Sequence, residues 1–350
     1  MQIQIEDVFI GDDYPCFIIA EAGVNHNGDI NKAKHLIDIA KESGANAVKF
    51  QTWITEELIT KAVRQAEYQE KNTGITESQY DMLKKLELNF EQFKELKEYA
   101  DKKGIMFLST PDDEKSVDFL YNLDIPAFKI GSGELTNIFL LKRVAEKEKP
   151  IILSTGMANL EEINTALDII YASGNKDVIL LHCTSQYPTK YKDVNLRAML
   201  TLKKKYNLLV GYSDHSLGSI VSHCAVSLGA CVLEKHFTYD KNAIGPDHLC
   251  SLNPEDLKNY VSEIRLVEKI LGKYEKTPSK EESQIRKIVR KTIVAKEKIM
   301  KGTTITEDLL TVKRSDGTIE PKDLYNFIGK VCIVDLEKDQ AIKPEFFKNV

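Results

Sequence analysis

Two histidines follow short apolar runs of the chain, at positions where they could share a divalent cation. His215 comes just after LLVGYS (208–213), and His236 lies near the end of CVLEKHF (231–237). Neutral imidazoles at neighbouring strand ends can bind one divalent ion and leave positions open for water and a substrate oxygen. Such a site acts as a Lewis acid. The alternative is one packed core histidine and one loop histidine.

Two lysines lie inside apolar runs, where an ammonium group is costly unless it is paired. Lys49 is in AVKFQT, and Lys129 is in AFKIGS. One interpretation is a salt bridge to Glu21 or Glu134. The other is an anion pocket, in which the ammonium groups, neighbouring hydroxyls and glycine amides would bind a phosphate.

These residues belong to a recurring pattern of short β-branched runs, separated in most cases by segments with helical periodicity. The pattern favours a parallel sheet covered by helices, and eight repeats favour a closed (β/α)₈ TIM barrel over an open sheet. Polar residues gather at the carboxyl end of every run, where barrels of this kind hold their active sites. The runs are 16–22, 46–52, 105–110, 126–132, 150–155, 178–184, 208–213 and 231–237.

The repeating pattern stops near Gly272, which predicts a catalytic barrel over residues 1–272. A polar, charged stretch follows and is interpreted as a linker over residues 273–290. Short β-like runs with Lys-Gly turns then predict a compact β-rich domain over residues 291–350. More than fifty residues separate the second and third runs, so we expect an insertion after the second strand, with a helical segment in TESQYDMLKKLEL.

Composition narrows the class of protein. The chain of 350 residues carries 48 basic and 53 acidic residues, with no dominant block of like charge, so nothing points to nucleic acid or a membrane surface. Its six cysteines are dispersed without a CxxC pair, which is typical of reduced core cysteines. The N-terminal segment lacks the features of a signal peptide, and no apolar run reaches the ~18 residues of a spanning helix. We therefore expect a cytoplasmic protein.

Several ordered motifs resemble those of the sialic acid synthase family, and the resemblance covers essentially the whole chain. They are FIIAEAGVNHNGD, AVKFQT, KIGSGE, ILSTGM, LHCTSQYP, GYSDHS, LEKHFT and GPDH. The C-terminal domain resembles the antifreeze-like (SAF) module of those enzymes. The resemblance implies a reaction in which phosphoenolpyruvate condenses with the open-chain aldehyde of an N-acetylated mannosamine-type sugar. The products are a nine-carbon 2-keto acid and phosphate.

The resemblance also implies roles for individual residues. His215 and His236 match the metal ligands, usually for Mn²⁺ or Mg²⁺. Glu21 is the candidate to accept a proton from water, and Glu134 is the second candidate acid or base. Arg314 matches an arginine that one protomer contributes to the barrel of the other, which implies a domain-swapped homodimer. The positions implied for phosphoenolpyruvate are Lys49, Thr110, Lys129, Ser132, Ser154 and Ser213, and those near the sugar are Gln51, Tyr187 and Asp247.

The acceptor sugar predicted first is N-acetylmannosamine, and 2,4-diacetamido-2,4,6-trideoxymannose is the alternative. N-acetylmannosamine would give N-acetylneuraminate, and 2,4-diacetamido-2,4,6-trideoxymannose would give N,N'-diacetyllegionaminate. Trp53, Asp112 and the segment 313–321 depart from the common bacterial pattern at places expected near the sugar. Rival functions are an aldolase that uses pyruvate directly, an ice-binding protein and a non-catalytic scaffold. The charged composition of residues 290–350 argues against ice binding.

Overall fold

The computed structural model describes residues 1–349, without the side chains of residues 67, 68 and 71. The chain divides into two compact units, Met1–Gly272 and Lys273–Val350, which are described separately. Within the described residues, we find no helix whose length and apolar character would let it cross a membrane.

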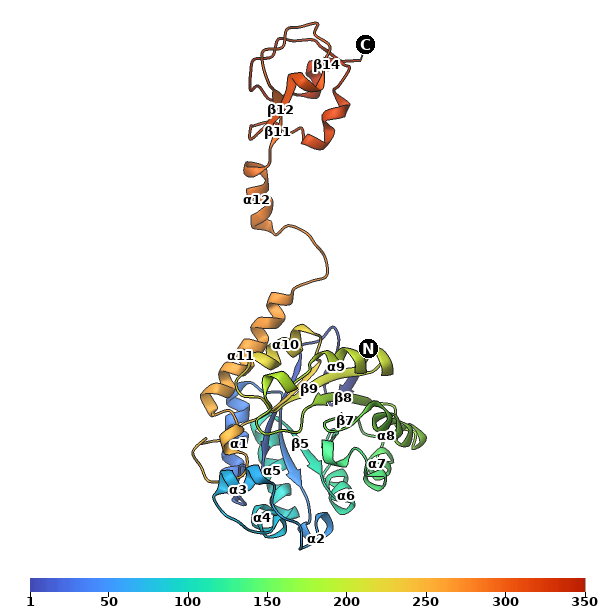
Figure 1. The fold of residues 1–350 in the computed structure, drawn as a ribbon, viewed down its shortest axis with the longest axis vertical. Coiled ribbons are helices and arrows are strands. Elements are labelled where there is room, and N and C mark those ends of the chain that lie inside the picture. Colours follow the sequence, from blue (N-terminus) through green and yellow to red (C-terminus); the bar gives the residue numbers. More distant parts are fainter. Residues whose placement is uncertain (350) are drawn as a thin grey trace. The chain divides into compact units, whose positions relative to one another are not determined.

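The first unit is built on eight parallel strands in the order β5-β4-β3-β10-β9-β8-β7-β6 (Figure 1). The end strands β5 and β6 lie side by side, so the strands close into a barrel. The predicted (β/α)₈ barrel is therefore confirmed. The strands are β3 (Phe17–Gly23), β4 (Ala47–Thr52), β5 (Met106–Pro111), β6 (Phe128–Ile130), β7 (Ile151–Ser154), β8 (Val178–Cys183), β9 (Leu209–Asp214) and β10 (Val232–His236).

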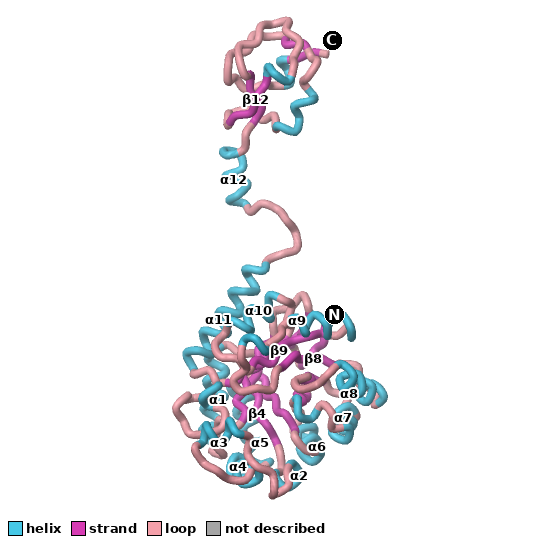
Figure 2. Tube along the Cα trace, viewed as in Figure 1, coloured by secondary structure: helices cyan, strands magenta, loops and turns pink. Residues whose placement is uncertain are grey.

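An outer layer of helices surrounds these strands (Figure 2). The first begins where the Asp29 carboxylate accepts hydrogen bonds from Asn31 N and Lys32 N, and it ends at Gly44, which adopts φ 82°. The layer consists of α1 (Ile30–Ser43), α5 (Phe90–Lys103), α6 (Glu114–Asn122), α7 (Ile138–Ala145), α8 (Leu160–Ala172), α9 (Arg197–Tyr206), α10 (Ile220–Ser227) and α11 (Pro254–Leu271).

The loop after β4 carries the predicted insertion. It contains α2 (Thr55–Leu58), α3 (Glu67–Thr73) and α4 (Gln79–Leu86), and α4 lies within the segment expected to be helical. Single 3₁₀ turns in other loops are η1 (Ser132–Glu134), η2 (Tyr191–Asp193) and η3 (His248–Cys250). The insertion packs against the barrel through a small cluster that includes Val24, Trp53 and Met82.

The barrel interior is apolar at the amino ends of the strands. Phe17, Leu108 and Ile152 belong to a buried cluster there. The antiparallel hairpin of β1 (Gln2–Ile5) and β2 (Val8–Gly11) adds two buried side chains to the same cluster. The sequence analysis did not predict this hairpin, although its alternation of polar and apolar residues is a strand signal. A second and larger cluster fills the space between the sheet and the helices.

The second unit has its own small core, which includes Ile293, Ile305 and Leu336. Its helix α12 lies in the segment expected to be a plain linker. The signal for this helix is the capping box that Ser279 forms with Glu282. The helix α12 spans Lys280–Val289. The elements after it are β11 (Thr292–Ala295), η4 (Glu307–Leu309), β12 (Leu310–Lys313), η5 (Pro321–Asn326), β13 (Val331–Cys332), η6 (Pro344–Phe346) and β14 (Phe347–Lys348). Two antiparallel pairs form, β11 with β12 and β13 with β14.

Candidate active site

The carboxyl ends of the barrel strands bring together buried charged side chains from separate strands. Glu21 of β3 lies beside Lys49 of β4 in the strand register, and His236 of β10 lies beside Glu21. Glu234 is two residues before His236, so both side chains point to the same side of β10. Glu21, Lys49, Lys129, Glu234 and His236 are all buried. The polar end of the barrel is therefore a group of charges shielded from water.

Each buried lysine is near a carboxylate. Lys49 Nζ is 2.8 Å from Glu21 Oε2 and donates a hydrogen bond to Thr110 Oγ1 at 2.9 Å. Lys129 Nζ is 3.7 Å from Glu234 Oε1 and donates to the carbonyl of Ile130 at 3.1 Å. Of the two salt bridges considered from the sequence, the one to Glu21 forms.

Glu134 is not a lysine partner among the described contacts. Its Oε2 accepts a hydrogen bond from Asn137 Nδ2 at 2.7 Å, which holds the carboxylate at the start of α7. Glu234 supplies the second counter-charge instead, with Oε2 3.9 Å from Lys49 Nζ and Oε1 3.7 Å from Lys129 Nζ. Sequence analysis missed Glu234 as a site residue. Its spacing of two from His236, on the same strand, is the signal that could have identified it.

The pKa values of the two buried glutamates are shifted in opposite directions. Burial raises the pKa of Glu21 to about 7. The charge of Lys49 opposes this rise, and the charge of Glu234 adds to it. Burial also disfavours the Glu234 carboxylate, but Lys129 and Lys49 outweigh it and bring the pKa of Glu234 to about 2. Carboxylates whose environments separate their pKa values in this way are suited to different roles. Glu21 can exchange a proton near neutral pH, whereas Glu234 stays charged.

The hydroxyl groups predicted to bind phosphoenolpyruvate lie on several strand ends and loops. Ser213 Oγ donates to Glu234 Oε1 at 3.0 Å, and Ser132 Oγ accepts from Gly156 N at 3.0 Å. Ser154 Oγ is buried and has no hydrogen-bond partner among the described residues. A buried hydroxyl without a partner costs free energy, so it is available for a ligand oxygen.

His215 and His236 face each other with ring centroids 5.4 Å apart. His215 Nδ1 is 3.0 Å from the carbonyl of Thr184, and because a carbonyl only accepts, Nδ1 carries the proton. His215 Nε2 is 3.0 Å from Tyr187 Oη, and in the neutral ring it can accept a hydrogen bond from that hydroxyl. His236 Nδ1 is buried without a hydrogen-bond partner among the described residues.

These two imidazoles fit a divalent cation that uses few protein ligands. Burial holds the pKa of His236 well below its usual range, so its ring is neutral as a metal ligand must be. Among the described residues, no group of three or more His, Cys, Asp or Glu side chains is arranged to hold a metal. The cation would therefore be bound by His215 and His236, and completed by water or substrate oxygens.

The residues predicted near the sugar lie around the histidines and Glu21. Tyr187 is beside both histidines, with ring centroids 4.1 Å from His215 and 5.7 Å from His236. Gln51 Nε2 donates to Glu21 Oε1 at 2.9 Å. Burial raises the pKa of Asp247 to about 6, and the nearby charge of His215 opposes this. The structure thus brings all three predicted side chains to the same end of the barrel.

Asp112, one of the departures from the family pattern, also belongs to this end of the barrel. Burial and then the charge of Glu134 raise the pKa of Asp112 to about 8, while Lys49 opposes the change. Its amide donates to the carbonyl of Thr52 at 3.0 Å, which fixes its backbone beside β4.

Arg314 lies in the second unit, at the end of β12. Its guanidinium is exposed, and Nε donates to the carbonyl of Val289 at 3.1 Å. The contribution to a partner's barrel that the resemblance implies for it stays a prediction, as does the homodimer.

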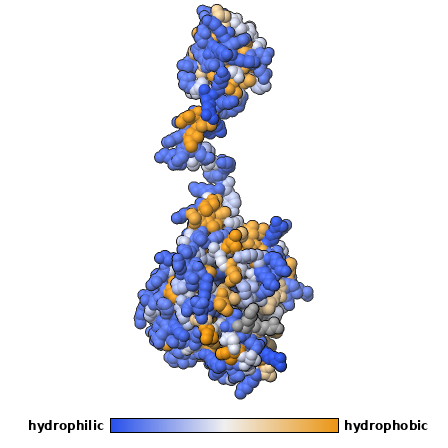
Figure 3. All heavy atoms as spheres, turned by 60° about the vertical axis from the view of Figure 1, so that its left-hand side comes forward, coloured by the Kyte–Doolittle hydropathy of each residue, from blue (hydrophilic) through white to orange (hydrophobic). Residues whose placement is uncertain are grey.

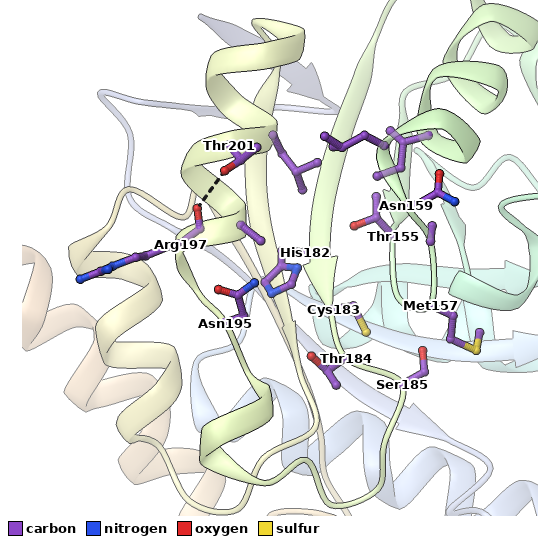
Figure 4. A pocket seen from close by; sticks show the side chains of 15 residues that line it. Thr155, Met157, Asn159, His182, Cys183, Thr184, Ser185, Asn195, Arg197 and Thr201 are labelled. Carbon is purple, nitrogen blue, oxygen red and sulfur yellow. Dashed lines mark hydrogen bonds between the residues drawn. The ribbon is translucent and has the colours of Figure 1, made fainter.

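A pocket of about 710 Å³ lies beside this site, between α8, α9 and the end of β8 (Figure 4). His182 lines it and is held by a contact of 2.8 Å between Nε2 and the carbonyl of Val194. Cys183 and Thr184 also line the pocket, and they contact His215. The end of β8 therefore separates the pocket from the histidine pair.

Comparisons with known proteins find relatives of this barrel that are sugar-acid synthases. The model of the NeuB family matches residues 36–276, and that of the SAF domain matches residues 290–348. The chain belongs to the NeuB family and carries a C-terminal SAF domain.

Three relatives illustrate the similarity. The chain is 49% identical to N,N'-diacetyllegionaminic acid synthase of Legionella pneumophila, over 93% of both chains. It is 38% identical to human N-acetylneuraminate-9-phosphate synthase, over 97% of this chain and 95% of the other. A crystal structure of N-acetylneuraminic acid synthetase from Leptospira borgpetersenii, in complex with citrate, is 37% identical, with TM-score 0.73 over 83% of this chain and 97% of that one.

Proposed function

We propose that the protein condenses phosphoenolpyruvate with the open-chain aldehyde of an N-acetylated amino sugar. The observation that carries the proposal is the buried group of two lysines and two glutamates next to the histidine pair. Lysines inside a barrel would bind the phosphate and carboxylate of phosphoenolpyruvate. The histidine pair would bind the divalent cation that polarises the aldehyde, and family membership supports the same chemistry.

The reaction has three steps. The C3 carbon of phosphoenolpyruvate attacks the aldehyde carbon, a C–C bond forms, and the aldehyde oxygen takes up a proton to become a hydroxyl. Water then adds to the electron-poor C2 and loses a proton. The resulting adduct breaks its C–O bond to phosphate and leaves a keto group at C2.

The chain supplies charge stabilisation and proton transfer. Lys49 and Lys129 hold the anionic phosphoenolpyruvate throughout, with Thr110, Ser132 and Ser154 donating hydrogen bonds. Ser213 also belongs to the predicted set, and it contributes once its hydroxyl turns from Glu234 to the ligand. Glu21, with its pKa raised to about 7, accepts the proton of the attacking water. Glu134 orients the sugar or gives a proton to the new hydroxyl. A divalent cation such as Mn²⁺ or Mg²⁺, when bound by His215 and His236, would supply Lewis-acid polarisation of the aldehyde.

The acceptor we favour is 2,4-diacetamido-2,4,6-trideoxymannose, which the sequence prediction ranked second to N-acetylmannosamine. The chain is 49% identical to a legionaminic acid synthase and 38% identical to a synthase of N-acetylneuraminate 9-phosphate. Both acceptors present the same aldehyde, so the roles of Glu21, Lys49 and the histidines do not depend on the choice. Gln51, Tyr187 and Asp247 would contact the parts of the sugar that differ.

The test is to incubate metal-stripped protein with phosphoenolpyruvate and each sugar in turn, with and without Mn²⁺. Phosphate release and product mass are measured together, and the Glu21→Gln variant is the matched control for background hydrolysis. We expect Mn²⁺-dependent phosphate release and a product mass equal to sugar plus pyruvate, fastest with the diacetamido sugar. Product formed from pyruvate without phosphate release would instead identify an aldolase. No product from either sugar with folded protein would overturn the proposed acceptors.

A further inference from the structure

A second buried ion pair lies next to the histidine pair in sequence, but on the other face of the same two strands. Lys235 Nζ is 3.0 Å from Asp214 Oδ2, and the two side chains are 1% and 0% exposed. Side chains alternate across a strand, so Asp214 and Lys235 point toward the helical layer while Glu234 and His236 point inward. None of the residues predicted for the site from the sequence belongs to this pair.

Hydrogen bonds tie this ion pair to the backbone that follows His215. Asp214 Oδ1 accepts from Ser216 N at 2.8 Å and from Ser216 Oγ at 2.6 Å. Lys235 Nζ donates to the carbonyl of Ser216. The N–H, hydroxyl and carbonyl of Ser216 are thus all bonded to the pair, which fixes the chain one residue after a predicted metal ligand.

The same carboxylate is held from the helical layer. Asp214 Oδ2 accepts from Ser222 Oγ of α10 at 2.6 Å, and Ser222 Oγ accepts from Tyr260 Oη of α11 at 2.9 Å. Asp214 therefore has four partners and Lys235 has two, so neither buried charge lacks compensation. The network joins β9, β10, α10 and α11.

The position of the pair in the sheet explains what it can do. Lys235 and Asp214 form the last register pair of the ladder between β9 and β10. His215 follows β9 directly and His236 is the last residue of β10, so both lie just beyond the part of the chain that this ladder holds together. A short ion pair at this point holds the two strands together just before the histidines.

We propose that Asp214 and Lys235 are positioning residues that set the separation and orientation of His215 and His236. The pair acts through the backbone of both strands and through Ser216, and it does not touch the substrates. The inference rests on the proposed function in one respect, namely that the two histidines bind a divalent cation. Groups that orient metal ligands from behind are common, and losing them weakens metal binding roughly 10- to 100-fold.

Three variants test this role. Lys235→Met removes the ammonium group at similar length, and Asp214→Asn removes the carboxylate charge. The double variant Asp214→Asn/Lys235→Met removes both charges together, which buried pairs often tolerate without loss of stability. Lys147→Met is the matched control, because Lys147 forms a partly buried ion pair with Asp118 on the outer helices.

Two affinities are measured on each folded variant. Mn²⁺ binding is followed by electron paramagnetic resonance, and phosphoenolpyruvate binding without metal is followed by calorimetry. We expect Mn²⁺ affinity to fall roughly 10- to 100-fold in the three variants, with phosphoenolpyruvate affinity changed less than about twofold. The Lys147→Met control should bind both as the unaltered protein does. A general loss of stability would instead weaken the binding of both Mn²⁺ and phosphoenolpyruvate.

The failure of this inference and that of the proposed function give different results. A folded double variant with unaltered Mn²⁺ affinity would overturn the positioning role, while leaving the proposed reaction intact. Failure of the unaltered protein to bind Mn²⁺ would count against the metal in the proposed function. In that case the ring signals of His215 and His236 in nuclear magnetic resonance spectra decide the inference. Shifts in both signals in the double variant support it, and unchanged signals refute it.

Discussion

Replacing Glu234 by Gln would remove the negative charge between two buried lysines without changing the shape of the side chain. The pKa of Glu234 falls from 4.5 to about 2 in the folded protein, which corresponds to about 3 kcal/mol of preferential stabilisation of the carboxylate. Because the carboxylate is buried, this free energy needs no reduction for exposure to solvent. We expect Glu234→Gln to lower the free energy of unfolding by about 3 kcal/mol at pH 7.

The sign of the pH dependence follows from the lowered pKa. Stabilisation by Glu234 is fully present above pH 4.5 and is lost as the pH falls toward 2. At pH 3, the difference in free energy of unfolding between the two proteins should therefore be less than half of the difference at pH 7. Urea denaturation can report this for the barrel alone, because the chain has a single tryptophan, Trp53, which is buried in the first unit.

The control is Glu98→Gln, which changes an exposed carboxylate on α5 by the same atoms. It should leave the denaturation curve within the error of the measurement. Suppose instead that Glu234→Gln unfolds at the same urea concentration as the unaltered protein at pH 7. The counter-charge role would then be refuted. A loss of stability that is equal at pH 7 and pH 3 would also refute it, since a charge-independent packing defect would be the cause.

Three further predictions concern Glu21. Glu21→Gln should lower turnover by roughly 10²- to 10⁴-fold, because it removes a proton acceptor, while calorimetry still detects phosphoenolpyruvate binding. Its raised pKa also means that the Glu21 charge opposes folding as the pH rises from 4.5 through about 7, so the variant should gain relative stability at pH 8. Binding of anionic phosphoenolpyruvate should raise the pKa of Glu21 further, giving proton uptake at pH 7 that appears as a buffer-dependent binding enthalpy. That buffer dependence should vanish in Glu21→Gln, and its persistence would place the proton elsewhere.

The barrel could be predicted from the sequence because its signals are local. Buried parallel strands appear as short β-branched runs, and the predicted segments overlap β3 through β10. The ends differ most at β6, predicted over residues 126–132 and observed as Phe128–Ile130. Strand ends depend on which backbone groups find partners in neighbouring strands, and this is information that a single run does not contain.

The pairing of charges within the site could not be predicted in the same way. The two buried lysines were expected to pair with Glu21 or Glu134, and Lys129 pairs with neither of them among the described contacts. It lies near Glu234, on a strand more than one hundred residues later. A closed barrel places the interior residues of distant strands in one layer, so the partner follows from strand order and register. Tyr187 contacts His215 from a loop after β8, and no local sequence pattern predicts the path of that loop.

The opposite faces of β10 show why a short polar sequence can end a buried strand. Leu233, Glu234, Lys235 and His236 are all buried, although three of them are polar. Alternation sends Glu234 and His236 to the interior, where they meet Lys129, Lys49 and His215, and sends Lys235 outward to Asp214. Each polar side chain thus has a task that an apolar residue could not perform. The inward-facing residues and the outward-facing ion pair can be separated by experiment because they lie on opposite faces of β10. Altering Lys235 should disturb the histidines while leaving Lys49, Lys129 and Glu234 in place.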